Sequence, residues 1–262
     1  MIYVGTAGYS YDDWKGTVYP EKAGKKEMLS LYVEQFMFTE VNSTYYRLPN
    51  KFMIYNMQAK TPQDFRFVIK AYKSLTHGRE DNRQDFLDFT EALQPLVEAG
   101  KLGCVLAQFP QSFRLSGANV TYVKDLAKRL EGLPTVVEFR HGEWVREDIF
   151  LFLTEQGLGY VCVDEPRLKG LVPPESRATS KTAYVRFHGR NSEKWWNHKE
   201  SYERYDYLYS EEELAEWVPG ISGLARRAET VYVSMNNHYR GQAVINARML
   251  RDMLKLAGEK VL

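Results

Sequence analysis

The sequence predicts a single (β/α)8 barrel of the TIM type that spans residues 1–262. Three observations predict it: the chain length, the alternation of short β-branched runs with amphipathic helical stretches, and the number of those runs, eight. A closed α/β barrel takes about 250 residues as one domain. Strands that alternate with helices pair in parallel through right-handed crossovers. An open doubly wound sheet is the alternative, but no GxGxxG turn follows any of the eight runs.

The expected strands are rich in Val, Ile, Phe and Tyr. In chain order they are Ile2–Gly8, Thr39–Asn42, Arg66–Lys70, Cys104–Phe109, Thr135–Arg140, Tyr160–Asp164, Ala183–His188 and Val231–Asn236.

Apolar residues at helical spacing lie between these runs, and each set forms one buried stripe. The stripes are Leu29, Tyr32, Val33 and Phe36; Phe86, Phe89, Leu93 and Leu96; Val123, Leu126, Ala127 and Leu130; and Val244, Ala247, Leu250 and Leu254. Ser210 followed by Glu213 is typical of a capping box that opens a helix. The unit after Asp164 has little room for a regular helix, because Pro166, Pro173 and Pro174 interrupt it.

Composition narrows the classes of function. Lys and Arg total 35 against 34 Asp and Glu, for a net charge of +1. A protein that lies along nucleic-acid phosphates usually has a clear basic excess, so nucleic acid is a possible partner that the charge does not favour. We expect no membrane partner, since no apolar run approaches about 20 residues. Cys104 and Cys162 stand in apolar runs, which predicts buried free thiols in a reducing cytoplasm, and the first residues do not resemble an export signal.

Strand alternation predicts which side chains enter the barrel. Apolar residues must face the helices, because an unpaired charge there costs several kcal/mol. An upper ring at the strand ends then holds Asn42, Lys70, Gln108, Arg140, Asp164, His188 and Asn236. A ring beneath it holds Glu40, Glu138 and Arg186. The lower ring has two interpretations: a ligand site, or a buried ion network that only holds the barrel together.

The two rings surround the mouth of the barrel at the carboxyl ends of the strands. The predicted chemistry of this mouth is that of an anion site with acid–base groups. Lys70, Arg140 and Arg186 suit a phosphate or carboxylate, and Glu138, Asp164 and His188 are the candidate catalytic groups. The candidate substrate-binding residues are Asn42, Lys70, Gln108, Arg140, Arg186, Asn236, Asn237 and Tyr9. We expect no cofactor and no metal. A metal held by Glu138, Asp164, His188 and His238 is the rival interpretation, without HxH, HExxH or CxxC spacing to support it.

The segment after the seventh strand is rich in aromatic residues. Trp195, Trp196, Tyr202, Tyr205, Tyr207 and Tyr209 alternate there with basic residues. They have two interpretations: surfaces on which bases or sugars stack, or a lid that packs over the barrel. The same two interpretations apply to the early loop, which contains Tyr9, Tyr11, Trp14 and Tyr19.

Several motifs resemble the domain-of-unknown-function 72 family of YecE-like proteins, nearly from end to end. They are Val4–Tyr11 with Trp14 and Tyr19-Pro20; Glu40–Pro49; Lys70 with Thr76-His77; Gln108–Pro110; Glu138–His141 with Trp144; Arg186–Arg190; Arg204–Ser210; and Asn236–His238 with Gly241–Ala243. Tyr9 stands where the family is expected to have Trp. The resemblance implies a TIM-type barrel and no settled activity. Its members have been likened to barrel-fold DNA-repair nucleases, which is an analogy of fold.

The sequence therefore predicts a protein that binds or turns over a small anionic, phosphorylated or sugar-containing molecule, as a hydrolase or lyase if it is an enzyme. The alternatives are a nucleic-acid-binding protein or metal-dependent nuclease, and a sensor without turnover. A glycosidase is disfavoured, because Gln108 and His188 stand where barrel glycosidases carry carboxylates.

Overall fold

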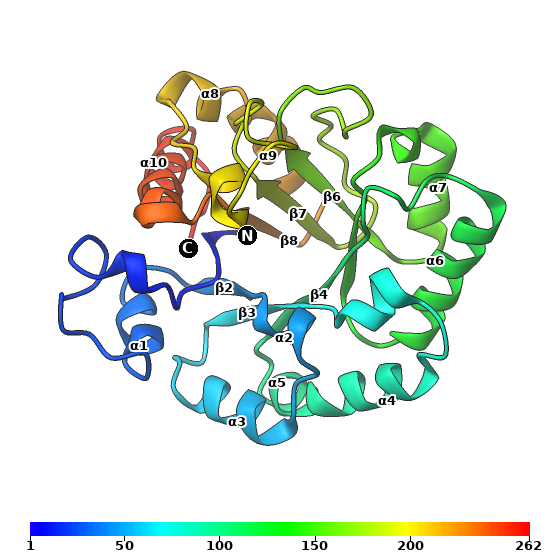
Figure 1. Cartoon of the computed structure of the whole chain (residues 1–262), viewed down its shortest axis with the longest axis horizontal. Coiled ribbons are helices and arrows are strands. Elements are labelled where there is room, and N and C mark those ends of the chain that lie inside the picture. The colour runs from blue at the N-terminus through cyan, green and yellow to red at the C-terminus, as the bar shows by residue number, and fades with distance from the viewer.

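Eight parallel strands pair in sequence order, and the last returns to the first, so that the sheet closes into a barrel with the helices outside it (Figure 1). This computed structural model describes residues 1–262 except for the side chain of Ser201. The strands are β1 (Ile2–Ala7), β2 (Phe38–Val41), β3 (Arg66–Lys70), β4 (Leu102–Gln108), β5 (Thr135–Glu138), β6 (Gly159–Asp164), β7 (Thr182–Phe187) and β8 (Thr230–Met235). The predicted (β/α)8 barrel is confirmed.

Helices follow most strands, as the apolar stripes predicted. They are α1 (Met28–Tyr32), α2 (Ser43–Tyr46), α3 (Lys51–Ala59), α4 (Arg83–Ala92), α5 (Gln94–Glu98), α6 (Gly117–Arg129), α7 (Glu147–Glu155), α8 (Glu211–Ala215), α9 (Val218–Ala225) and α10 (Gln242–Leu256). The predicted capping box is present at α8, where Ser210 and Glu213 exchange hydrogen bonds. Residues 165–181, between β6 and β7, contain no helix, in agreement with their prolines. No described helix combines the length and apolar character needed to cross a membrane.

The core has two parts, one between the strands and the helices and one inside the barrel. Inside, Phe38, Val68, Leu106 and Val136 meet three tyrosines, Tyr3, Tyr184 and Tyr232. Side chains therefore fill the lower interior, as in a packed barrel rather than a pore. Polar residues begin only above this apolar layer, at the carboxyl ends of the strands.

β1 carries a glycine because the barrel interior leaves no room for a side chain there. A Cβ on Gly5 would lie 2.4 Å from the carbonyl oxygen of Phe38 and 2.9 Å from its ring. Phe38 belongs to β2, so Gly5 permits the close approach of β1 to the neighbouring strand. The two cysteines are free and buried, as predicted.

Candidate functional site

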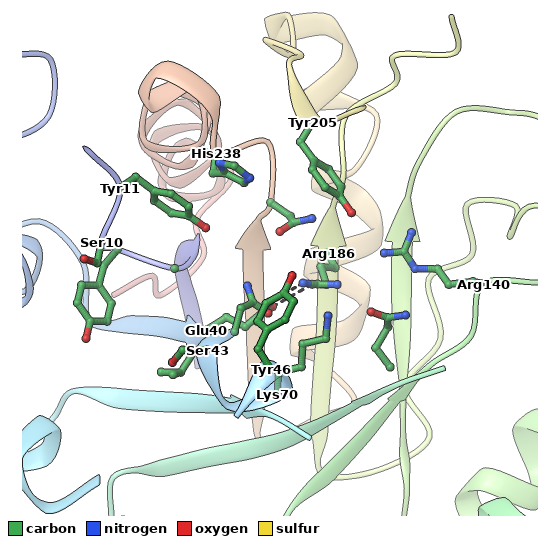
Figure 2. Close-up of a pocket in the computed structure, with 16 residues that line it drawn as sticks. Ser10, Tyr11, Glu40, Ser43, Tyr46, Lys70, Arg140, Arg186, Tyr205 and His238 are labelled. Atoms are coloured by element: carbon green, nitrogen blue, oxygen red, sulfur yellow. Dashed lines mark hydrogen bonds and ion pairs between the residues drawn. The ribbon is translucent and has the colours of Figure 1, made fainter. Parts of the chain in front are cut away.

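A cavity of about 510 Å³ occupies the mouth at the carboxyl ends of the strands. It is open to the solvent, and loops after β1, β2, β7 and β8 form its walls. In Figure 2, Ser10, Tyr11 and His238 lie on one side, opposite Lys70, Arg186 and Arg140. The residues that line it are Gly8, Tyr9, Ser10, Tyr11, Glu40, Val41, Asn42, Ser43, Tyr46, Lys70, Gln108, Arg140, Arg186, Tyr205, Asn236 and His238.

Seven of the eight residues predicted to bind a substrate line this cavity: Tyr9, Asn42, Lys70, Gln108, Arg140, Arg186 and Asn236. The alternation of the strands brings six of them together, because their apolar neighbours do pack against the helices as expected. Tyr9 comes from the loop after β1. Asn42 presents a buried Oδ1 acceptor that has no partner among the described atoms.

A buried ion network forms the floor of the cavity. Arg186 in β7 donates to both carboxylate oxygens of Glu40 in β2, Nε at 2.9 Å and Nη2 at 2.5 Å. Its Nη1 reaches Glu138 in β5 at 3.0 Å. The Tyr184 hydroxyl and the Ser234 hydroxyl also donate to Glu40. Arg186 therefore holds two carboxylates whose side chains are 0% exposed, across the width of the barrel.

Arg140 lies above this network and contacts two carboxylates. Its Nε lies 2.6 Å from Glu138, and its Nη1 donates to Glu165 at 3.0 Å. Its Nη2 donates no hydrogen bond within the part of the chain that the structure describes. Burial alone would raise the pKa of Glu138, but the charges of Arg186 and Arg140 hold that pKa well below its usual range. Glu138 is therefore a fixed anion at neutral pH.

His188 is fully buried beneath the mouth and does not line the cavity. The Asn236 amide donates to Nδ1 at 2.9 Å, so Nε2 carries the proton and donates to Glu138 at 3.1 Å. Burial and the charge of Arg140 lower the pKa of His188 well below its usual range. In this arrangement His188 is neutral and both its nitrogens are occupied, so it orients Glu138 and Asn236 rather than facing a ligand.

Lys70 differs from the two arginines because no carboxylate pairs with it among the described residues. Its Nζ lies over the ring of Tyr45, 4.7 Å from the centroid. Burial, and then the positive charge of Arg186, lower the pKa of Lys70 to about 7, against the opposing effect of Glu40. The mouth thus contains a lysine whose amine is uncharged in a large fraction of molecules at neutral pH.

The predicted inward direction of Asp164 is wrong. Val161 and Val163 pack inside the barrel, so Asp164 at the end of β6 faces the helices. There it accepts hydrogen bonds from Arg190, from the Tyr209 hydroxyl at 2.6 Å and from Trp217 Nε1 at 2.7 Å. Its oxygens are occupied on the far side of the sheet from the mouth, so it cannot act with Glu138 and His188.

Asn237 also lies away from the cavity, contrary to prediction. It is 0% exposed, and its amide donates to the Tyr207 carbonyl and to the side chain of Asn246 in α10, both at 2.8 Å. The strand pleat explains this, because Asn236 faces inward and the next residue must face outward. Asn237 connects the loop after β7 to α10.

The four residues of the rival metal interpretation do not converge. Asp164 faces the helices, and the His238 ring stacks on Tyr11 at 4.4 Å on the other wall of the mouth. Within the described part of the chain, no three His, Cys, Asp or Glu side chains are grouped as metal ligands would be.

The aromatic segment after β7 mostly packs as a lid. Trp195 and Tyr209 are each 1% exposed, whereas Trp196 and Tyr202 are exposed, at 55% and 37%. Tyr205 lines the mouth and also a smaller cavity of about 240 Å³. That second cavity shares Gln108, Arg140 and Tyr205 with the first and continues toward Trp196.

Several residues of the site lie outside the strands, in loops or in the short helix α2, and were not predicted. They are Ser10, Ser43, Tyr46, Tyr205 and Glu165. A loop residue has no pleat to indicate its direction, so only its nearness to a strand end could have suggested it. Tyr205 stood in the aromatic segment noted above, but its sequence position did not distinguish it from the buried tyrosines.

Comparisons with known proteins identify the family. The model of the "Protein of unknown function DUF72" family matches residues 3–262. The chain belongs to this family. It is 30% identical to the UPF0759 protein YunF of Bacillus subtilis (strain 168), over 98% of this chain and 95% of that protein.

Solved structures of the DUF72 family share the fold. A protein from Thermotoga maritima MSB8 has a TM-score of 0.89 at 43% identity, covering 97% of this chain and 99% of the other. One from Enterococcus faecalis V583 has a TM-score of 0.87 at 26% identity, covering 97% and 96%. Neither name states a ligand or a reaction.

Proposed function

We propose that this DUF72 protein binds a small anionic molecule, phosphorylated or carboxylated, in the mouth of its barrel. One observation carries the proposal: the cavity of about 510 Å³ is lined by Lys70, Arg140 and Arg186, with Glu40 as the one carboxylate among its lining residues. Cavities of this size take small ligands. The ligand would sit above the ion network, which closes the barrel beneath it.

Two features favour an anion over a neutral ligand. Glu40 is already bonded to Arg186, Tyr184 and Ser234, so little of its charge remains for the cavity. Lys70 lacks a carboxylate partner among the described residues, and Arg140 keeps Nη2 for a further acceptor. An anion that contacts both cations would gain charge-assisted hydrogen bonds of about 1.5–3 kcal/mol each.

The buried network is also consistent with this role. A network that served stability alone would need no space above it, whereas here an open cavity lies over Arg186 and Glu40. Arg140 then has two functions, since it pairs with Glu138 and Glu165 and also lines the cavity, with no hydrogen bond from Nη2 to the described residues.

The test is isothermal titration calorimetry with glycerol 3-phosphate and with glycerol as its uncharged match. We expect binding of the phosphate ester and none of glycerol. Lys70→Met should weaken binding about tenfold or more, because loss of one charge-assisted contact of about 1.5 kcal/mol corresponds to a factor of ten. Arg146→Met removes an arginine exposed beside Asp148, outside the mouth, and is the matched control.

The proposal predicts that glycerol 3-phosphate and inorganic phosphate compete for one site per chain. Equal binding by wild type, Lys70→Met and Arg146→Met would contradict it, since the anion would then bind elsewhere. If no member of a panel of phosphorylated and carboxylated metabolites binds, the proposal is also wrong.

A further inference from the structure

We propose that Lys70 is the nucleophile of the mouth, and that the anion bound there carries an aldehyde or ketone which the Nζ amine captures as a Schiff base. This inference rests on the proposed function for the anionic character of the ligand. It adds the substrate class, a carbonyl compound, and a covalent step at a named atom.

The placement of Lys70 is the first argument. It is the last residue of β3, and its side chain enters the mouth because Val68 lies in the barrel interior and Ile69 faces the helices. Its Nζ approaches the face of Tyr45 and the cavity that Lys70 lines. Figure 2 shows the side chain extending toward Arg186 among the residues that line the cavity.

The missing counter-ion is the second argument, because Arg186, Arg140 and the buried Lys101 all have oxygen partners. Arg186 and Arg140 each contact two carboxylates. Lys101 donates from Nζ to the carbonyls of Gln58 and Thr61, both at 2.7 Å. The Nζ of Lys70 is paired with no carboxylate and no carbonyl oxygen among the described residues. A purely structural lysine would be held by acceptors, whereas a nucleophile needs its lone pair available.

The electrostatic surroundings supply the reactive form of the amine. Burial and the nearby arginines lower its pKa to about 7, so close to half of the molecules carry a neutral amine at pH 7. An exposed lysine, with a pKa near 10.4, has its neutral amine in only about one molecule in 2,500 at that pH. The site therefore raises the concentration of the nucleophile about a thousandfold.

The step balances without any oxidant or reductant. The Nζ lone pair forms a bond to the carbonyl carbon, and the carbonyl π pair moves to oxygen, which takes a proton to give a carbinolamine. That oxygen then takes one further proton and leaves as water, while nitrogen forms the C=N bond. Nitrogen loses one of its two protons, so the net change is uptake of one proton and release of one water. The ligand's anionic group would meanwhile lie against Arg140.

The test is reductive trapping, because hydride from sodium cyanoborohydride converts a Schiff base to a stable secondary amine. The probes are glyoxylate, a small aldehyde with a carboxylate, and glycolaldehyde, an uncharged aldehyde of similar size. We expect one glyoxylate adduct per chain, mapped to Lys70 by peptide mass spectrometry. It should form at least tenfold faster than adducts at exposed lysines and faster than the glycolaldehyde adduct.

Variants and pH give the controls. Lys70→Arg and Lys70→Met should both lose the fast adduct, while Lys73→Arg, an exposed lysine three residues further on, should keep it. The trapping rate at Lys70 should reach half its maximum near pH 7. Glycolate, which has the same carboxylate but no carbonyl, should slow the reaction.

The outcomes separate the two proposals. Anion binding by calorimetry without a fast adduct at Lys70 overturns this inference and leaves the proposed function intact. A fast Lys70 adduct that glycolate and phosphate do not slow, together with no anion binding, overturns the proposed function and the anionic part of this inference. Labelling spread evenly over exposed lysines, unchanged in Lys70→Arg, refutes the nucleophile.

Discussion

Replacing Arg186 by methionine tests whether the ion network at the floor of the mouth carries the stability that its geometry implies. Met keeps much of the side-chain length but removes every contact to Glu40 and Glu138, whose carboxylates are 0% exposed. Glu138 retains Arg140 and His188, whereas Glu40 retains only the hydroxyls of Tyr184 and Ser234. Most of the cost therefore falls on Glu40.

Two estimates bound the magnitude. Breaking a buried ion pair by removing one partner costs about 3–5 kcal/mol. Alternatively, a glutamate that has lost its counter-charge can take up a proton. Protonating a glutamate of ordinary pKa at pH 7 costs about 4 kcal/mol. We therefore expect Arg186→Met to lower the free energy of unfolding by about 3–4 kcal/mol at pH 7.

The penalty should depend on pH in a defined direction. In the native protein the pKa of Glu138 is held low, so its contribution to stability is present above the unfolded value and is lost as the pH falls. In the variant, an uncompensated carboxylate is protonated more easily at lower pH, by about 1.4 kcal/mol per unit. The first effect begins only below the unfolded value of about 4.3, whereas the second already makes the difference between variant and wild type smaller at pH 5 than at pH 7.

Urea unfolding followed by circular dichroism at the two pH values measures this. Arg146→Met breaks an exposed pair with Asp148 and should leave stability nearly unchanged, because exposed ion pairs contribute little. The double variant Glu40→Gln with Arg186→Met should recover part of the loss, because the unpaired charge is gone. A change below about 1 kcal/mol for Arg186→Met, or an equal penalty at both pH values, would refute the reasoning.

Three further predictions use the same unfolding assay. Asp164→Asn should lower the free energy of unfolding by about 3 kcal/mol, because it breaks a buried pair with Arg190. The affinity for the anion should not change. A loss of affinity without a loss of stability would show that Asp164 acts in the mouth. Lys70→Met should not destabilise the fold. Because the folded pKa of Lys70 lies below its unfolded value, this residue should make the wild-type protein more stable as the pH rises from 7 to 10. The variant should lack that rise in stability. Gly5→Ala should cost about 1–3 kcal/mol through its clash with the Phe38 carbonyl, and a neutral result would show that β1 and β2 can separate.

The sequence allowed the fold and most of the mouth to be predicted, because charge and apolar character alternate along most strands. In β5, Val137 and Phe139 had to face the helices, which placed Glu138 and Arg140 inside. The same contrast placed Lys70 and Arg186. Wherever a strand carried a polar residue between apolar ones, the direction of each side chain followed from the cost of burying a charge.

The rule failed in β6 because that strand offers no contrast. Val161, Cys162 and Val163 are all apolar, so either face could have been the inner one, and the choice reversed Asp164. What decides its direction is the group of partners contributed by Arg190, Tyr209 and Trp217, between 26 and 53 residues later in the chain. Such long-range pairing leaves no periodic signal in a single sequence. Likewise, the burial of His188 beneath the cavity depends on how the lid packs, which strand alternation does not indicate.

The closure of the sheet by β1 and β8 has a consequence for synthesis of the protein. Five residue pairs join Ile2–Thr6 to Val231–Met235, strands about 230 positions apart in the chain. While translation proceeds, β1 and the most recently made strand each present an open edge with unsatisfied backbone groups, which readily pair with other chains. Because Arg186 in β7 must reach back to Glu40 in β2, the floor of the mouth also cannot form early. The nascent chain therefore stays vulnerable to aggregation until its eighth strand has left the ribosome, and chaperone dependence during translation should be concentrated in that interval.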